Sequence, residues 1–335
     1  MGLLEVRGAI AVDQFWPEGA SDADTTKVVV STKPGAFQFQ QHPGVPLATT
    51  HAFDGAKVKG KMTKAAIDAQ GRITVRLQGI DAPELHYRPG ALPKAATAEQ
   101  RLRFKEVNHE YRQHLGETAA AELHKLVKEA GKTNVPCIVT TIVDKPGDVF
   151  DVYGRFVGDI ALSIGGSEMN INHWLVEQGW AFPAFYNSMT AEEIGQFIAS
   201  AKEGRKKKRI WQYLQKKVGQ FDAGLLYRGK GATPDPAADK GPLVFPKLFR
   251  RLCTWWAQRK AGYVKGSFAR YLADQPDPLF LTDEFLEQGP YAATEHVLNE
   301  YLKSDGEFAL QPEQVVFKEK PSKLVGPDGK PVTDW

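Results

Sequence analysis

Three charged side chains suited to phosphate chemistry come from one predicted strand and the turn after it. Within residues 75–84, Arg76 lies near the start of the strand, and Asp81 and Glu84 follow at i+5 and i+8. Pro83 has no N–H and disfavours a helical conformation at the residue before it, so the chain must leave the strand here. The sequence therefore predicts that Asp81 and Glu84 lie at the strand's end.

A second polar group stands further along the chain, where residues 151–155 read Asp-Val-Tyr-Gly-Arg. The guanidinium of Arg155 is planar, stays ionised and can bind two phosphate oxygens at once. Taken alone, such an arginine is usually half of a strand-end ion pair. Tyr153 has two readings, a side chain beside a phosphate pocket or an ordinary core tyrosine.

The two segments together resemble the motifs of the staphylococcal nuclease family, which has Arg, Asp and Glu at i, i+5 and i+8 and then Asp-x-Tyr-Gly-Arg. The downstream segments NINHWLVEQGWA and AKEGRKKKRIW are similar to further family patterns, so the resemblance covers residues 5–212. It implies an α+β protein whose first domain is a five-stranded oligonucleotide-binding-type barrel with three helices.

The resemblance also implies catalytic roles. Arg76 and Arg155 would clamp the scissile phosphate and neutralise charge on its oxygens, and Glu84 would orient or deprotonate the attacking water. The 5′ oxygen would leave, which yields 3′-phosphate ends. We expect Arg76→Ala or Arg155→Ala to abolish activity with the fold kept.

The substrate contacts expected from the sequence are Tyr153, Lys206 and Lys207. The two lysines belong to the cationic run 205–209, RKKKR, at the end of a predicted helix. Such a run attracts a phosphate backbone, although a solvated helix face is the commoner reading.

Family metal sites use an aspartate from the first strands, the aspartate at the turn and the backbone carbonyl after it. Asp81 and Ala82 fit the last two. The resemblance thus implies one divalent cation, with Ca²⁺ preferred for oxygen ligands and Mg²⁺ or Mn²⁺ as alternatives.

Two segments compete for the remaining ligand. Residues 22–25 read Asp-Ala-Asp-Thr, which makes Asp24 the ligand and Asp22 its neighbour. The alternative, Asp54-Gly-Ala, is nearer Arg76 but puts Ala56 at the ligand position, which would cost the site a carboxylate. We prefer Asp24, since a longer loop between strands costs little free energy.

The elements that must position these residues are visible as short apolar strands and amphipathic helices. Strand patterns cover EVRGAIAV, TKVVVS, AFQFQ, RITVRLQGI, PCIVTTIVD and YGRFVGDIAL. Helical spacing covers residues 118–130, 169–178 and a segment from Thr190, where Thr190 and Glu193 predict a capping box.

Composition limits the classes of protein. The 335 residues carry 43 basic and 40 acidic side chains, so attraction to nucleic acid must be local. The two cysteines are too few for a disulfide framework. Neither a secretory signal nor a membrane-spanning run is visible, which leads us to expect a cytoplasmic protein without a membrane partner.

Domain organisation is predicted from a Gly-, Pro- and Ala-rich stretch, GKGATPDPAADKGP, at residues 229–242. We expect a nuclease domain over 1–228, a linker over 229–242 and a helical extension of unassigned role over 243–335. Bases and indoles interleave over 250–260, which suits stacking of unpaired bases or, alternatively, an ordinary packed helix.

The sequence therefore predicts a metal-dependent nuclease acting on DNA, RNA or both. One rival is a barrel that binds nucleic acid or protein but has lost catalysis. A second rival is an interaction protein whose C-terminal helices hold a protein partner.

Overall fold

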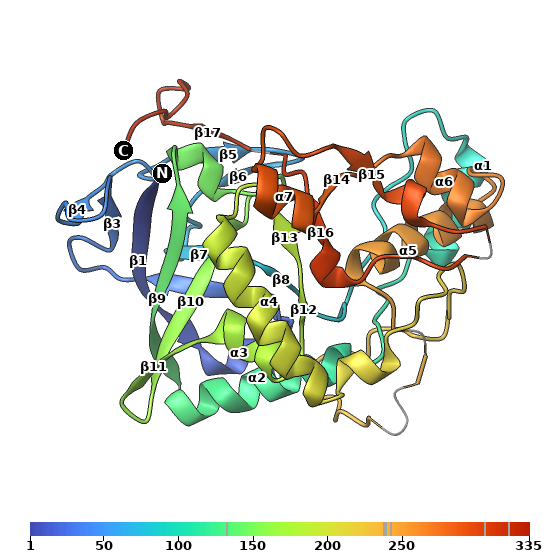
Figure 1. Cartoon of the computed structure of the whole chain (residues 1–335), viewed down its shortest axis with the longest axis horizontal. Coiled ribbons are helices and arrows are strands. Elements are labelled where there is room, and N and C mark those ends of the chain that lie inside the picture. The colour runs from blue at the N-terminus through green and yellow to red at the C-terminus, as the bar shows by residue number, and fades with distance from the viewer. Residues whose placement is uncertain (132, 237–239, 242, 305, 321) are drawn as a thin grey trace.

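Five strands close into a barrel in this computed structural model (Figure 1). They are β1 (Gly2–Ala11), β2 (Thr25–Val30), β7 (Arg72–Leu77), β10 (Phe156–Ile164) and β9 (Asn134–Val143). β1 pairs with both β2 and β9, β2 pairs with β7, and β9 pairs with β10. The parallel pairing of β7 with β10 completes the ring. The expected five-stranded barrel is confirmed.

The structure describes residues 1–131, 133–236, 240–241, 243–304, 306–320 and 322–335.

Period-two alternation explains which side chains fill the barrel. In β1, Leu4, Val6 and Ile10 are fully buried, while Arg7 between them is exposed. In β7, Ile73 and Val75 point inward in the same way. Alternating branched apolar residues are typical of strands with one buried face, so the sequence pattern and the barrel agree.

A long insertion separates β2 from β7. It contains β3 (Phe37–Gln40), β4 (Ala48–Thr49), β5 (Lys57–Lys59) and β6 (Thr63–Ala65). β3 pairs with β1 and with β4, and so extends the barrel sheet beyond the ring. The paired barrel strands β2 and β7 are therefore far apart in the chain but adjacent in space.

Short strands complete the first part of the chain: β8 (Ile80–Asp81), β11 (Ser167–Asn170), β12 (Phe182–Pro183) and β13 (Phe185–Tyr186). The 3-10 helices are η1 (Val12–Gln14), η2 (Pro146–Val149), η3 (Ile210–Tyr213), η4 (Leu298–Tyr301) and η5 (Pro312–Gln314).

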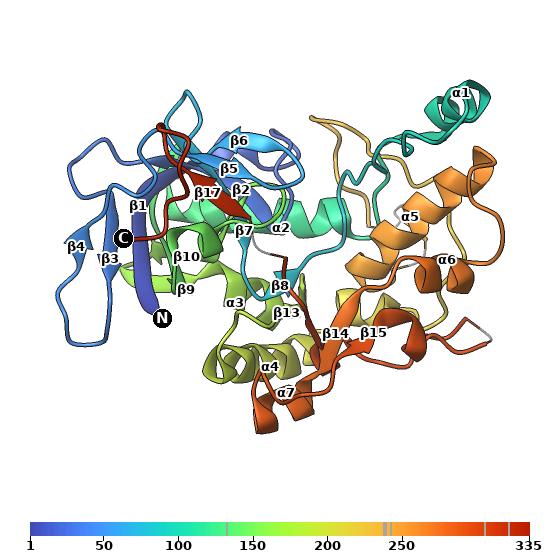
Figure 2. The same cartoon turned by 90° about the horizontal axis from the view of Figure 1, so that it is seen from above.

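Three helices pack against the barrel, as expected. They are α2 (Gly116–Ala130), α3 (Ile171–Glu177) and α4 (Ala191–Lys206). The predicted capping box of α4 is present, with Thr190 and Glu193 bonded reciprocally. A fourth helix, α1 (Ala98–Val107), lies in the insertion after Glu84, on the side of the molecule away from β3 and β4 (Figure 2).

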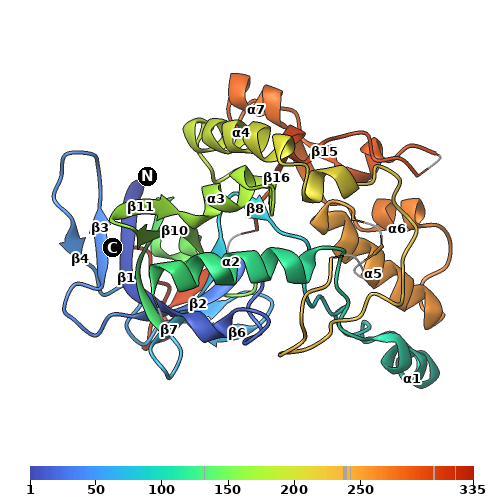
Figure 3. The same cartoon turned by 90° about the horizontal axis from the view of Figure 1, so that it is seen from below.

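The C-terminal region is mainly helical. It contains α5 (Pro246–Lys260), α6 (Phe268–Asp274) and α7 (Thr282–Gln288). Figure 3 shows α5 and α6 near α1, beyond the end of α2. The strands of the C-terminal region are β14 (Pro278–Leu281), β15 (His296–Val297), β16 (Val315–Phe317) and β17 (Lys323–Val325). Among the described residues, no helix is both long enough and apolar enough to span a membrane.

This region joins the first part of the chain through strands as well as helices. β16 pairs with β13, and β17 pairs with β5. One hydrophobic core contains residues from both parts, from Leu4 to Leu324. Within the proposed linker 229–242, residues 237–239 and 242 lie outside the described residues, and the rest form no helix or strand. The division at this linker stays a prediction.

Candidate active site

The β7–β8 turn positions the first charged group. Gly79 has φ +74, and a Cβ there would lie 2.3 Å from the Phe197 ring, so this position requires glycine. The turn lets Asp81 follow β7 closely enough to meet Arg76 of that strand. The chain then leaves β8 at Pro83, as the sequence predicts.

Strand pairing brings the other predicted residues to the same place. In the β2–β7 ladder Thr25 is opposite Arg76, so Asp24, just before β2, reaches the Arg76 guanidinium. In the β7–β10 ladder Val157 is opposite Arg76, which places Arg155 just before β10 on the same side of the ring. Three segments far apart in sequence therefore converge because of the barrel's register.

Arg76 is held between two carboxylates. Its Nη1 lies 2.6 Å from Asp24 Oδ2, and its Nη2 lies 2.9 Å from Asp81 Oδ1 and 3.0 Å from the Ile80 carbonyl oxygen. The side chain is only 9% exposed. Desolvation opposes its charge, but Asp24 and Asp81 outweigh that effect and raise the pKa of Arg76. Arg76 is thus fixed in position and ionised.

Arg155 occupies a more open position. Its Nε and Nη2 both lie 2.7 Å from Asp151 Oδ2, and its Nη1 donates to Thr25 Oγ1 at 3.1 Å. Thr25 Oγ1 in turn donates to Asp24 Oδ1 at 3.1 Å, so Arg155 connects to Arg76 through Thr25 and Asp24. The Arg155 side chain is 27% exposed, which leaves it accessible to a ligand from solvent.

Tyr153 lies beside Arg155 at this open edge. The Arg155 guanidinium is 5.5 Å from the centre of the Tyr153 ring, and Lys61 Nζ donates to the Tyr153 hydroxyl at 2.8 Å. Tyr153 is 45% exposed, so it is not a core residue. Its predicted contact with substrate stays a prediction.

The structure adds an arginine that the sequence did not assign to this site. Arg250 of α5 donates from Nη1 to Asp81 Oδ1 at 3.1 Å and from Nη2 to Asp81 Oδ2 at 3.0 Å. The same Nη1 also pairs with Glu84 Oε1. Glu84 itself is 13% exposed, and Asp81 is 2% exposed. No local sequence signal indicates a partner so distant in the chain.

We call this group the arginine–carboxylate cluster: Asp24, Arg76, Asp81, Glu84, Arg155 and Arg250.

Charges within the cluster shift its carboxyl groups in opposite directions. Burial alone would raise the pKa of Asp24, but Arg76, Arg155 and Arg250 outweigh it and lower that pKa to about 2. Burial raises the pKa of Glu84; Arg250 opposes this, while Asp24 adds to it. Asp24 is therefore a fixed anion, whereas Glu84 is a stronger base than a free glutamate.

Asp22 and His86 border the cluster. Burial, followed by the charge of Asp24, raises the pKa of Asp22 to about 7. Its Oδ1 has no hydrogen-bond partner among the described residues. His86 Nε2 donates to the Ala20 carbonyl at 2.8 Å; burial opposes its protonation, but Asp22 and this bond raise its pKa overall.

The competing ligand segment lies elsewhere. Asp54 is an exposed residue whose carboxylate pairs with His51 at 2.9 Å, and Ala56 is buried in the hydrophobic core. Asp24, by contrast, contacts Arg76. The structure therefore places the preferred candidate, and not the alternative, beside the catalytic arginine predicted from the sequence.

The residues expected to bind a cation offer oxygen ligands, which suit a hard ion, but these oxygens are not arranged to bind one. Asp81 Oδ1 accepts hydrogen bonds from Arg76 and Arg250, which fills its two acceptor positions. Asp24 Oδ2 is engaged by Arg76 and by the Ala82 N–H at 3.2 Å. Across the described ranges, no three histidine, cysteine or carboxylate side chains are grouped to hold a metal ion. As arranged here, the set does not fit a resident cation.

The predicted lysine contacts are not brought to the cluster by any described interaction. Lys206 pairs with Glu203 at 2.6 Å on α4, and Lys207 is exposed at the end of that helix. Their neighbour Arg205 pairs with Glu313 of the C-terminal region. A role for Lys206 and Lys207 in substrate binding stays a prediction.

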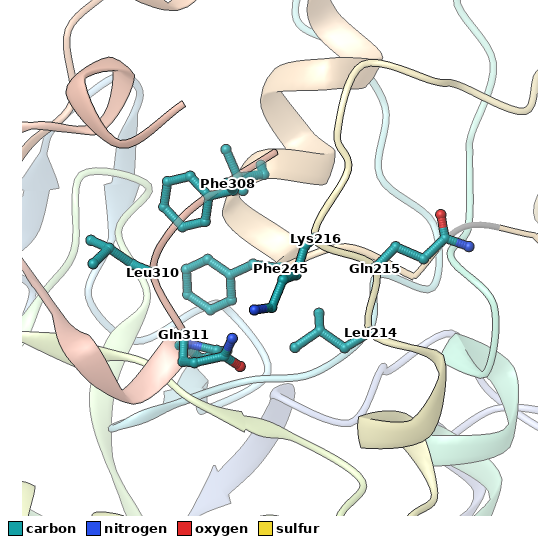
Figure 4. A pocket seen from close by; sticks show the side chains of 9 residues that line it. Leu214, Gln215, Lys216, Phe245, Phe308, Leu310 and Gln311 are labelled. Atoms are coloured by element: carbon teal, nitrogen blue, oxygen red, sulfur yellow. The ribbon is translucent and has the colours of Figure 1, made fainter. Parts of the chain in front are cut away.

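A small pocket lies away from the cluster, between residues 214–216, the start of α5 and residues 308–312 (Figure 4). Figure 4 shows Phe245, Phe308 and Leu310 around it. It contains no side chain of the cluster and no carboxylate, so it offers no catalytic groups.

A comparison with known protein families matches a segment that includes the β7 strand and the turn after it. No curated protein matches the chain. Residues 74–213 match the sequence model of the staphylococcal nuclease homologue family. The matched range includes Arg76, Asp81, Glu84 and Arg155. A domain of this kind indicates nucleic-acid binding or nuclease activity. Residues 74–213 are thus similar to the staphylococcal nuclease homologue family.

Proposed function

We propose that this protein is a phosphodiesterase that hydrolyses DNA, RNA or both. The observation that carries the proposal is the convergence of two segments on one side of the barrel: the β7 strand and its turn, with Arg76 and Glu84, and the segment before β10, with Arg155. Arg76 and Arg155 connect through Thr25 and Asp24, and Glu84 connects to Asp81 through Arg250.

Each group has a chemical task in this reaction. A water oxygen bonds to phosphorus while the bond from phosphorus to the 5′ oxygen breaks, and the leaving oxygen takes a proton. Arg76 and Arg155 neutralise the negative charge that builds on the non-bridging oxygens. Glu84 accepts the proton of the attacking water, a role that its raised pKa supports. The products would carry 3′-phosphate ends.

The exposed fractions of the side chains indicate the direction of approach. Arg155 and Tyr153 reach solvent, whereas Arg76 lies behind Asp24 and Asp81. A phosphate would meet Arg155 first. Loss of one preorganised donor to a developing oxyanion costs roughly 10²–10³ in rate, which sets the scale expected for Arg155→Ala.

Dependence on a divalent cation, Ca²⁺ first, is part of the proposal. Five acidic side chains, those of Asp22, Asp151 and the cluster's three acidic residues, lie around three guanidinium groups. Asp22 Oδ1 has no partner among the described residues, which supports a site with acceptor capacity to spare. Arg250 contacts both oxygens of Asp81, so a cation that binds Asp81 would compete with this guanidinium group.

The test is an assay of the full-length protein on end-labelled single- and double-stranded DNA and RNA, with Ca²⁺, Mg²⁺, Mn²⁺ or a chelator. The proposal predicts cleavage that the chelator abolishes, with products whose mobility changes after phosphatase treatment. No cleavage of any of the four substrates would contradict it.

A second candidate function is binding without hydrolysis. It is favoured by one observation: Arg76, Arg155 and Arg250 are all already paired with carboxylates. Salt-dependent binding of the same labelled strands without product formation would support this candidate. A protein partner of the C-terminal region also stays a prediction, to be tested by pull-down with the full chain.

A further inference from the structure

Arg250 comes from outside the segment that matches the nuclease family. It lies in α5, whereas the matched segment ends at residue 213. Its partners Asp81 and Glu84 precede it by 169 and 166 residues. The C-terminal region therefore supplies a charged group to the centre of the candidate active site.

The contact is built into the fold and is not a chance surface pair. Gln113, which is fully buried, accepts from the Glu84 N–H at 3.1 Å and donates to the Val244 carbonyl at 2.7 Å. It thereby ties the Glu84 turn to the residues just before α5. On α5 itself, Thr254 Oγ1 bonds to the Tyr87 hydroxyl at 3.0 Å, close to the same turn.

The guanidinium of Arg250 contacts both oxygens of the Asp81 carboxylate. Two N–H groups reach the two oxygens of Asp81 at 3.1 and 3.0 Å, and Glu84 is paired with the same guanidinium. This fork-to-fork geometry is the strongest form of arginine–carboxylate pairing. Asp81 is 2% exposed, so little water competes for it.

We infer that Arg250 takes the place of a cation between Asp81 and Glu84 and competes with divalent metal ions for these two carboxylates. The inference rests on the proposed function insofar as it assumes that a metal ion belongs at this site. A divalent cation needs carboxylate oxygens that are free to coordinate it, and Arg250 holds both oxygens of Asp81. Metal loading then requires Arg250 to leave, so α5 controls access to the site.

The experiment measures cation binding to the full-length protein by calorimetry, with Ca²⁺ alone and no nucleic acid. Arg250→Met removes the charge and the fork while keeping a long side chain. We expect the Kd for Ca²⁺ to fall at least tenfold relative to the wild type. An unchanged or higher Kd in Arg250→Met would overturn the inference.

The chain offers a matched control on the same helix. Arg251 is similarly exposed, 31% against 27%, and makes a two-pronged pair with Asp277 outside the cluster. Arg251→Met should leave the Kd within about twofold of the wild type. An equal gain in affinity in both variants would show that loosening of α5, and not removal of the competing charge, is responsible, and would also overturn the inference.

Two further variants keep the result interpretable. Arg250→Lys retains one charge without the fork, so its Kd should lie between those of wild type and Arg250→Met. Asp81→Asn combined with Arg250→Met should abolish the gain, because the cation would lose its ligand. Retention of the gain would place the cation elsewhere and contradict the inference.

Failure of this inference can be told apart from failure of the proposed function. The calorimetry contains no substrate, and the cleavage assay is scored separately. A lower Kd in Arg250→Met without any cleavage would refute the nuclease alone. Cleavage by the wild type with no change in Kd would refute the competition alone.

Discussion

The pair formed by Arg76 and Asp24 allows a prediction of stability that depends on burial. The two side chains are 9% and 10% exposed and meet at 2.6 Å. We expect Arg76→Met to destabilise the fold by about 3–5 kcal/mol, because it leaves a buried carboxylate without its main partner. The sequence alone suggested that removal of Arg76 would spare the fold; the burial of this pair predicts otherwise.

The pKa of Asp24 gives a second measure of its ionic stabilisation. The fall from the usual 3.8 to about 2 corresponds to roughly 2 kcal/mol of stabilisation. Since the folded pKa lies below the unfolded one, this contribution is present above pH 4 and is lost as pH falls through 2. Asp24→Asn removes the charge that Arg76 compensates, so the two substitutions should not be additive.

The assay is urea unfolding at pH 7, followed by tryptophan fluorescence, of the wild type, Arg76→Met, Asp24→Asn and the double variant. We expect the double variant to lose about 2 kcal/mol less than the sum of the single variants. The exposed pair Glu99–Arg103 on α1 is the control, with coupling of about 0.5 kcal/mol or less. Coupling between Arg76 and Asp24 as small as in the control would refute the reasoning.

Three further substitutions test other parts of the account. Asp22→Asn should stabilise the protein by ~1–3 kcal/mol at pH 8 but not at pH 4. The folded pKa of Asp22 is about 7, so the stability of the wild type falls as pH rises from 3.8 to 7. Equal effects of the substitution at both pH values in urea unfolding would contradict this. Leu324→Ala, in β17, should cost about 2–4 kcal/mol if the C-terminal strand belongs to the core; a loss below ~0.5 kcal/mol would show that it does not. Gly79→Ala should cost about 1–3 kcal/mol through its positive φ and the contact with Phe197, and an unchanged urea midpoint would argue against a strained turn.

Most of the barrel could be predicted because its signals are local. Alternating apolar residues marked β1, β2, β7, β9 and β10, and helical spacing marked the three helices that pack on them. These patterns depend on which face of an element is buried, which the sequence records residue by residue.

Part of the cluster was predictable for the same reason. Arg76, Asp81 and Glu84 occur on one strand and its turn, so their spacing alone places them together. Asp24 was favoured over Asp54 by its local Asp-x-Asp-Thr pattern, and the strand register places it beside Arg76.

Arg250 could not be predicted, because nothing in the sequence around α5 specifies a partner 169 residues away. The bases and indoles of this helix suggested a stacking surface. Instead, Trp255 is 6% exposed, Arg251 pairs with Asp277, and α5 buries Leu252. The packed-helix alternative describes it better.

The C-terminal end illustrates the same limit. The partners of its last residues are set by tertiary contacts, which no local pattern in the sequence specifies. Val316 pairs with Phe185, Leu324 pairs with Val58, and Trp335 stacks on Phe39 at 4.1 Å.

The most direct test of the central claim is the single-turnover cleavage rate of Arg155→Ala on the best nucleic-acid substrate. Arg155 is more exposed than Arg76, so its loss should affect chemistry more than folding. The control is Arg270→Ala, which removes an exposed arginine of α6. We predict a cleavage rate at least ~10²-fold below the wild type for Arg155→Ala, and a wild-type rate for Arg270→Ala. Cleavage by a folded Arg155→Ala protein at the wild-type rate would contradict a phosphate site built from Arg76 and Arg155.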